Sequence, residues 1–383
     1  MDQLVTAEKN TEFTVRTVLK IGLSVISLLL TLSVLALLFL GNSFGGHSCI
    51  ITSANASLQD GFDTFINRMI SHAMDGVISV EMVYTLNDSD IVAPEPNQEN
   101  FGMTEDPSTL QWLINKAHHQ MDGQTMYFTT DTPILEGSRV RYYLDDTILV
   151  VTWKRPIDNV VYTFSEVKIQ HPSQFRRFLA DGKYGSDKQY LTSQMAASVN
   201  AVVASAGDFY KYRKGGVVVY NGKVERFHGT YIDNCFIDDQ GDLLFSRAGE
   251  LNNNKELETY VKENNVRFSL SFGPILIENG ENQVPWDYPL GEINEKYARA
   301  AICQLGPLHY LLLSVNDEEN YGMFPNLQKL SRTLIREGIQ KAYTLDGGQT
   351  ATIVMNDEVI NHVSYGAQRY ISDIIYFATA IPD

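Results

Sequence analysis

The sequence predicts an α+β fold: a mixed, largely antiparallel sheet body with packed helices, preceded by one N-terminal transmembrane helix. Three observations support this prediction. An uncharged apolar stretch occupies residues 21–40. Strand-like segments separated by turn residues dominate from about residue 123 onward, and amphipathic helical patterns interrupt them, most clearly over 326–338. We therefore divide the chain into a cytoplasmic tail (1–20), the transmembrane helix (21–40), an extracellular stalk or accessory region (41–122) and one large domain (123–383).

The stretch 21–40 has the length of a membrane-spanning helix, because about twenty apolar residues at helical rise match the hydrocarbon core of a bilayer. Lys9, Arg16 and Lys20 precede it, whereas the next basic residue after it is Arg68. This asymmetry predicts a cytoplasmic N-terminus, with the large domain outside the cell and the protein held at the cell membrane. A cleaved signal peptide is the alternative, although the stretch is longer than a usual signal core and no Ala-x-Ala site follows.

Within the large domain, β-branched and aromatic enrichment predicts strands, and the pair Asn221-Gly222 predicts a tight hairpin. Asn326 can cap the helix at 326–338, and Gly338 suits the left-handed position after its end. Strands are expected at 139–143, 147–153, 159–169, 216–220, 224–227, 268–277, 308–315 (within the apolar segment 302–315), 342–345, 352–355 and 358–363, and further helices at 188–203 and 251–264. Residues 87–107 are expected to form a loop of the stalk.

Composition excludes one class of partner. The 383 residues carry a net charge of −16, and a surface this acidic repels nucleic acid. An anionic substrate therefore needs a local basic pocket. The sequence holds no Gly-Lys-Ser/Thr phosphate loop, no His-Glu-x-x-His and no nicotinamide fingerprint, so no cofactor is required. A divalent cation remains open, and metal ligands are unknown.

The sharpest candidate for chemistry is Asp346-Gly347-Gly348, followed by Thr350. The carboxylate stands at the end of a predicted strand, a usual place for ligands in α/β sheets. Two glycines allow backbone N–H groups to point at one anion, and the hydroxyl adds a donor. The alternative is a tight turn with a solvated aspartate.

Other candidates are single residues. Asp208, in a second Gly-Asp pair, can orient a sugar hydroxyl or act on a proton; a turn cap is the alternative. Arg299 precedes an apolar strand, so it is expected to be partly buried and to need an anionic partner. That partner is either a phosphate or a structural carboxylate. Arg213 and Arg369 are further basic candidates.

Six motifs, taken in order, resemble the phosphodiester glycosidase family over about residues 125–383. They are Gly-Asp-Phe-Tyr (207–210), the basic hairpin Lys-Tyr-Arg-Lys-Gly-Gly-Val-Val-Val-Tyr-Asn-Gly-Lys-Val (211–224), Ser-Phe-Gly-Pro-Ile-Leu-Ile-Glu-Asn-Gly (271–280), Arg-Ala-Ala-Ile (299–302), Leu-Asp-Gly-Gly (345–348) and Arg-Tyr-Ile-Ser-Asp-Ile-Ile-Tyr (369–376). The family includes an animal enzyme that releases N-acetylglucosamine from a phosphodiester, and membrane-anchored bacterial members related to exopolysaccharide. The chain departs from the family pattern at Ala206, Cys303 and Gln349, which leaves the sugar and the aglycone open.

The resemblance implies a membrane-anchored extracellular glycosidase that cleaves a sugar-1-phosphodiester in a cell-surface glycan or exopolysaccharide. By that resemblance Asp346 stabilises the oxocarbenium-like centre or activates water, and Asp208 assists it. Arg299 and the segment 347–350 would hold the phosphate. Arg213 and Arg369 would contact substrate or phosphate, and Arg369 would also brace the site together with Asp373.

Two other classes of function remain open. One is a non-catalytic glycan- or cell-wall-binding module that uses the same cleft, and release of sugar from a phosphodiester would separate it from an enzyme. The other is a structural surface protein whose accessory region binds a partner.

Overall fold

The structure is a computed structural model that describes residues 92–120, 125–213, 215–228, 231–288, 293–316 and 324–380. The predicted transmembrane helix at 21–40 and most of the predicted stalk lie outside these residues. Within the described ranges, no helix is both long and apolar enough to cross a membrane.

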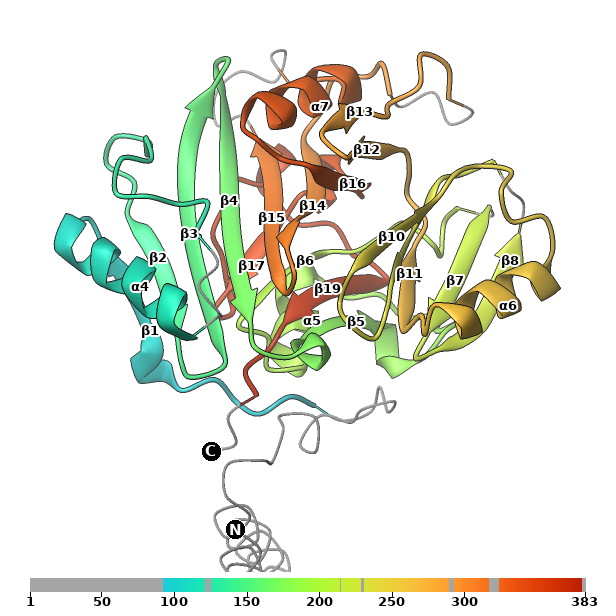
Figure 1. Cartoon of the computed structure of the whole chain (residues 1–383), viewed down its shortest axis with the longest axis horizontal. Helices are drawn as coiled ribbons and strands as arrows, with labels where there is room; N and C mark the ends of the chain where they lie inside the picture. Colours follow the sequence, from blue (N-terminus) through green and yellow to red (C-terminus); the bar gives the residue numbers. More distant parts are fainter. Residues whose placement is uncertain are drawn as a thin grey trace, which may run out of the picture. The chain divides into compact units, whose positions relative to one another are not determined.

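A nine-stranded sheet forms the centre of the described body (Figure 1), in the order β1-β2-β3-β4-β15-β14-β16-β12-β13. Its strands are long where the sequence is rich in β-branched and aromatic residues. In spatial order they are β1 (Phe101–Thr104), β2 (Val140–Leu144), β3 (Ile148–Ile157), β4 (Val160–Ile169), β15 (His309–Asn316), β14 (Arg299–Gly306), β16 (Lys341–Leu345), β12 (Ile275–Glu278) and β13 (Glu281–Asn282).

Three smaller sheets complete the strand layers. A five-stranded sheet runs β18 (Glu358–Val359), β17 (Ile353–Met355), β6 (Val203–Ala206), β19 (Asp373–Phe377) and β5 (Phe175–Leu179). A three-stranded sheet runs β10 (Leu243–Ser246), β9 (Asn234–Ile237) and β11 (Phe268–Leu270), and a hairpin joins β7 (Gly216–Tyr220) to β8 (Lys223–His228).

Helices cover the outer faces of these sheets (Figure 1). They are α4 (Pro107–Gln120), α5 (Thr192–Ser198), α6 (Asn254–Glu263) and α7 (Leu327–Arg336). Leu327, Leu330 and Leu334 of α7 are buried against one face of the nine-stranded sheet, in a cluster that also includes Leu110 and Leu113 of α4. Spacing of three and four residues places the α7 leucines on one side of the helix, so burial of that side holds the helix on the sheet.

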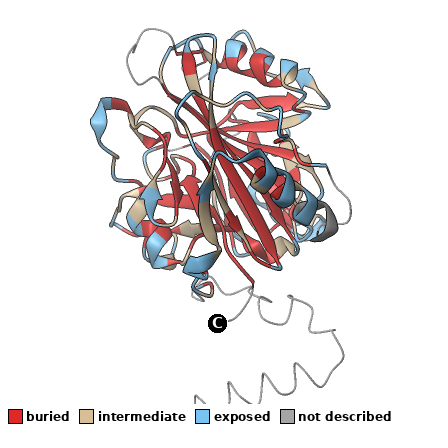
Figure 2. Ribbon diagram, turned by 90° about the vertical axis from the view of Figure 1, so that its left-hand side faces the viewer, coloured by how far each residue is buried: buried red, intermediate tan, exposed pale blue. Residues whose placement is uncertain are grey.

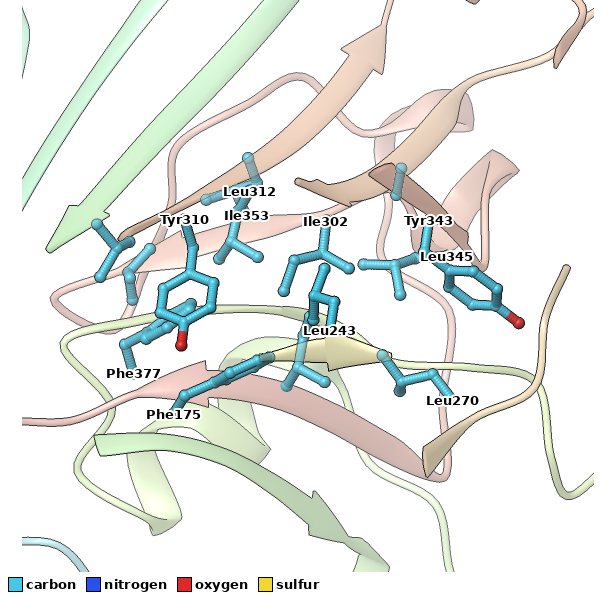
Figure 3. Packing of buried hydrophobic residues seen from close by; sticks show 14 of the residues in the cluster. Phe175, Leu243, Leu270, Ile302, Tyr310, Leu312, Tyr343, Leu345, Ile353 and Phe377 are labelled. Carbon is cyan, nitrogen blue, oxygen red and sulfur yellow. The ribbon is translucent and has the colours of Figure 1, made fainter. Parts of the chain in front are cut away.

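The largest hydrophobic cluster lies on the opposite face of the nine-stranded sheet. Figure 3 shows Ile302 and Leu312 of that sheet facing Phe175 and Phe377 of the five-stranded sheet, with Leu243 of the three-stranded sheet alongside. Phe175 and Phe377 stack with ring centroids 4.7 Å apart. The strands are mostly buried, while exposed residues concentrate on helices and loops (Figure 2). The two layers of strands therefore share one core, which fixes the loops at their ends.

The predicted α+β class is confirmed, with one correction to the sheet: every strand pair in the described residues is antiparallel, so the sheet is not mixed. A parallel pair would need a crossover connection between its two strands, usually through a helix, and no neighbouring strands in the described residues are joined by such a crossover. Phe101–Thr104 and α4 fall in the segment that was assigned to the stalk and, in part, to a loop, yet β1 pairs with β2 as the edge of the sheet. The folded body therefore begins before residue 123.

Candidate active site

A pocket of about 360 Å³ opens at the ends of strands from several sheets. Its described lining residues include three cations, a single carboxylate and five aromatic rings. They are Phe209, Arg213, Phe272, Lys296, Tyr297, Phe324, Asp346, Gly347, Gly348, Gln349, Ser364, Tyr365 and Arg369. Aromatic surface combined with a few convergent polar groups is typical of small-molecule sites.

Asp346 supplies the carboxylate of this pocket. It directly follows β16, whose last residue Leu345 pairs with Ala300 in the sheet. The Asp346 backbone N–H donates to the carbonyl of Gly207, 3.2 Å away, so the loop after β16 is tied to the loop after β6. The prediction that Asp346 stands at a strand end is confirmed.

The two glycines after Asp346 allow the chain to turn close to the start of β14. A Cβ on Gly347 would lie 2.5 Å from the carbonyl oxygen of Ala298, far inside van der Waals contact. Gly348 has φ +65°, and its N–H donates to the same carbonyl over 2.8 Å. The Thr350 N–H and hydroxyl both donate to the carbonyl of Gly347. These donors therefore form hydrogen bonds within the chain. Contrary to the prediction from the sequence, the N–H groups of Gly348 and Thr350 do not point at an anion.

Burial raises the pKa of Asp346 to about 6. Arg369, the Thr350 hydroxyl, Arg213 and the Gly347 N–H oppose that rise because each stabilises the charged carboxylate. The group is thus ionised at neutral pH and titrates close to it. A nearly buried carboxylate with a pKa near the working pH is typical of catalytic acids and bases.

Arg369 pairs with this carboxylate: its Nη2 lies 2.9 Å from Asp346 Oδ2. The guanidinium also lies over the ring of Phe209, 5.2 Å from its centroid. Its buried Nε has no hydrogen-bond partner among the described residues. A buried donor without a partner is costly, so an oxygen of a bound ligand would complete the site.

Arg213 lies on another wall of the same pocket, with its guanidinium 4.4 Å from the centroid of the Phe272 ring. Its Nη1 donates to the Phe272 carbonyl. Arg226 clamps the loop that carries Arg213, because it donates to the carbonyls of Tyr210 and Arg213 over 2.6 and 3.1 Å. Two arginines that are held by rings and carbonyls therefore present positive charge beside Asp346.

Asp208 lies beneath the pocket and does not line it among the described residues. Its side chain is fully buried, and Arg177 binds both Asp208 and Asp373 at 2.8 Å. Asp208 also accepts the N–H groups of Tyr210 (2.9 Å) and Ser271 (2.7 Å). Burial raises the pKa of Asp373 in this cluster. With its oxygens taken by these donors, Asp208 positions the loop that bears Phe209 rather than facing a ligand.

Gly207 shows how tightly this cluster is packed. A Cβ at that position would lie 2.0 Å from Asp373 Oδ2. Only glycine fits between β6 and the buried carboxylate, which explains the Gly-Asp pair in structural terms.

Arg299 is buried behind the pocket wall, as its position before an apolar strand predicted. Its Nε donates to the Pro325 carbonyl over 3.3 Å and its Nη2 to that of Glu295. The guanidinium lies 4.1 Å from the centroid of the Tyr297 ring. Tyr297 lines the pocket and Arg299 does not. The geometry therefore favours a positioning role for Arg299, and its expected contact with phosphate stays a prediction.

Sequence reasoning did not single out Arg177, Lys296, Tyr297 or Tyr365. Tyr365 is 76% exposed and lines the pocket, and its backbone is held at φ +64°. A bulky residue in the left-handed region is a genuine outlier, and such strain clusters at ligand sites. The flanking Gly366 was the one local sign of an unusual turn. Arg177 gave no local sign because its partners are distant in sequence.

No group of three or more His, Cys, Asp or Glu side chains in the described part of the chain is arranged to hold a metal ion.

Taken together, the fold and the pocket define an antiparallel α+β protein with a pocket lined by cations, aromatic rings and one carboxylate. The model of the phosphodiester glycosidase family matches residues 199–378, which include Asp208, Arg299, Asp346 and Arg369. This segment of the chain is similar to that family, as the sequence motifs indicated. A search of curated proteins found no match.

The chain is also similar to solved structures. The catalytic domain of zebrafish N-acetylglucosamine-1-phosphodiester alpha-N-acetylglucosaminidase, auto-inhibited by its pro-peptide, matches with a TM-score of 0.51 and 15% identity, over 78% of this chain and 99% of that one. A hypothetical protein from Synechocystis matches with a TM-score of 0.43 and 12% identity, over 65% and 64% of the two chains. An exported protein from Burkholderia pseudomallei matches with a TM-score of 0.39 and 10% identity, over 57% and 74%.

Proposed function

We propose that this protein is a glycosidase that cleaves a sugar-1-phosphodiester, held at the cell membrane through residues 21–40 with its catalytic domain outside. The substrate would be a cell-surface glycan or exopolysaccharide. The observation that carries the proposal is the buried Asp346 carboxylate beside two arginines in an aromatic pocket. The match to the phosphodiester glycosidase family model and the fold shared with the zebrafish enzyme's catalytic domain support the same reaction class.

The charges of the pocket fit a phosphate leaving group. When water replaces the phosphate at the anomeric carbon, the C1–O bond breaks and a phosphate monoester departs with extra negative charge. Arg213, Lys296 and Arg369 line the pocket and would stabilise that charge. A phosphate needs charge stabilisation more than protonation, so a second carboxylic acid is not required for its departure.

Asp346 would serve the sugar side of the reaction. Its carboxylate, ionised at neutral pH, can stabilise positive charge at the anomeric carbon or take a proton from the attacking water. The rings of Tyr297, Phe324 and Tyr365 offer apolar surface for a sugar face. The unpartnered Nε of Arg369 would bind a phosphate oxygen.

Release of reducing sugar tests this proposal. The detergent-solubilised full chain is incubated with the methyl diester of N-acetylglucosamine 1-phosphate and, as a matched control, with methyl N-acetylglucosaminide, which lacks the phosphate. We expect release from the diester and none from the plain glycoside. Binding of the diester without any release would favour the glycan-binding module instead.

A further inference from the structure

A second, larger cavity lies apart from the Asp346 pocket and shares none of its described lining residues. Its volume is about 760 Å³. It forms where the edge strand β5 of the five-stranded sheet meets the turn of the β7–β8 hairpin and the helix α6. Neither the family match nor the proposed reaction gives this cavity a role.

The cavity is basic, although the chain as a whole has a net charge of −16. Arg176, Arg267, Lys223 and Lys262 line it, whereas its described acidic lining residues are Asp239 and Glu258. Arg177 also belongs to the wall, but its guanidinium is fully buried and committed to Asp208 and Asp373. A basic hollow in so acidic a molecule concentrates anions locally.

Among the arginines of this cavity, the charge of Arg267 has no described carboxylate within ion-pair distance. It is half-buried, its Nη1 donates to the Pro172 carbonyl over 2.7 Å, and it forms no ion pair within the described residues. Burial and the nearby charge of Arg176 lower the pKa of Arg267 to about 10. The guanidinium remains protonated at neutral pH, so two cations line the same cavity and repel each other. Asp238 favours the charged form of Arg267 but forms no ion pair with it. An oxyanion between them would remove that repulsion.

Aromatic rings fix the orientation of both arginines. The Arg176 guanidinium lies 5.9 Å from the centroid of the Tyr376 ring, and that of Arg267 lies 5.9 Å from the centroid of Phe268. Planar guanidinium groups held in this way suit two-point binding of phosphate oxygens. The volume exceeds the need of a bare ion and fits a phosphorylated sugar.

We propose that this cavity is a second binding site, which takes the phosphate group of a phosphorylated sugar through Arg176 and Arg267. Lys262 on α6 supplies additional positive charge at its rim, whereas Lys223 on the hairpin turn is paired with Glu225. The site stands on its own residues, so it does not depend on whether the Asp346 pocket is catalytic.

Isothermal titration calorimetry of the detergent-solubilised full chain tests the proposal, with glucose 1-phosphate and inorganic phosphate as separate probes at matched ionic strength. Arg267→Met keeps an unbranched, flexible side chain and removes the guanidinium, and we expect it to weaken binding at least tenfold. Arg369→Ala disables the other pocket and serves as the control, so binding at the second site should survive it. Tighter binding of glucose 1-phosphate than of phosphate would identify a sugar-phosphate site, and equal binding a plain phosphate site.

Lys262→Glu gives a second test if Arg267→Met fails to fold. Lys262 is exposed on α6, so its reversal leaves the core untouched and should still weaken binding several-fold. The proposal is overturned if the wild-type chain binds neither probe, if all binding disappears in Arg369→Ala, or if the folded Arg267→Met variant binds as tightly as wild type.

Discussion

At the scale of single residues, the environment of Asp346 decides which chemistry the pocket can support. Burial raises the pKa of this carboxyl to about 6, while Arg369 and Arg213 favour its charged form. The same arginines line the pocket in which we propose that a phosphate binds. One ion pair therefore does two things: it keeps Asp346 ionised near neutral pH, and it holds the guanidinium of Arg369 where a leaving group would need it.

The pH dependence of kcat/KM follows from this titration. If Asp346 acts as the ionised group, kcat/KM should rise with pH through about 6 and stay level above it. A phosphodiester substrate does not titrate in this range. In the Arg369→Ala variant the opposing cation is gone, so the inflection should move to higher pH. A profile that falls above about pH 6 would mean that Asp346 acts as a proton donor instead.

We expect substitution of Tyr365 to affect the stability of the fold and the binding of substrate in different ways. Asparagine adopts the left-handed conformation more readily than tyrosine. Tyr365→Asn should therefore keep or raise the melting temperature, and it should increase the free energy of unfolding by up to ~1 kcal/mol. The loss of an aromatic surface should raise KM about 3- to 10-fold, with little effect on kcat. Thermal unfolding and steady-state kinetics measure the two effects, and an unchanged KM would remove Tyr365 from the substrate surface.

At the scale of elements, buried ion pairs beneath the pocket hold its loops in place. Arg177 on β5 binds Asp208, just after β6, and Asp373 at the start of β19. Adjacent strands are thus joined by charge as well as by backbone hydrogen bonds. The loop after β6 then receives the Asp346 N–H, so the cluster reaches the carboxylate through one further bond.

Asp208→Asn tests this structural assignment. Loss of a buried charge partner of Arg177 should destabilise the fold by about 3 kcal/mol, at the lower end for such pairs because Asp373 remains. Asp346→Asn, at the pocket surface, should change the free energy of unfolding by less than about 1 kcal/mol. Urea denaturation of both variants measures the contrast. Equal stability of the two would contradict the bracing role of Asp208.

Local patterns predicted the elements that depend on neighbours in sequence. The hairpin across Asn221-Gly222 and the helix capped by Asn326 are present, and Gly338 follows that helix at φ +84°. The predicted apolar strand at 308–315 is present as β15, whereas the predicted strand at 268–277 is instead two strands, β11 and β12, which belong to different sheets. The expected helix at 188–203 is shortened to Thr192–Ser198.

The candidate site was predicted in part, for a physical reason. Asp346, Arg213 and Arg369 line one pocket, as expected of residues at strand ends and loops. Asp208 and Arg299 were expected to face ligand but are buried by partners that lie far away in sequence. Apolar neighbours in a sequence predict burial, but they do not tell whether a buried charge meets a ligand or another part of the chain. The Arg177 cluster depends on strand order, which local patterns do not contain.

At the scale of the whole molecule, two hollows of an acidic protein concentrate positive charge. The net charge is −16, yet both large cavities are lined mainly by cations among their charged residues. Screening by salt acts most on exposed charges, so binding in these hollows should resist salt better than a surface patch would. The proposed location outside the cell agrees with a glycan substrate.

The membrane orientation remains a prediction from residues 21–40 and their flanking charges. Protease added to intact cells should remove the large domain, while a cytoplasmic marker protein stays intact. The reason is that basic residues on the N-terminal side keep that end inside. Protection of the domain until the cells are lysed would contradict the orientation.

The central claim is that Asp346 stabilises the transition state for cleavage of a sugar-1-phosphodiester. Steady-state kinetics of Asp346→Asn on such a substrate test it most directly, with Asp357→Asn as a matched exposed control and circular dichroism to confirm folding. Because the carboxylate meets charge that develops only in the transition state, kcat should fall by ~100-fold or more while KM changes little. The control variant should retain full turnover. Near-normal turnover of Asp346→Asn would contradict the catalytic role and favour a binding module.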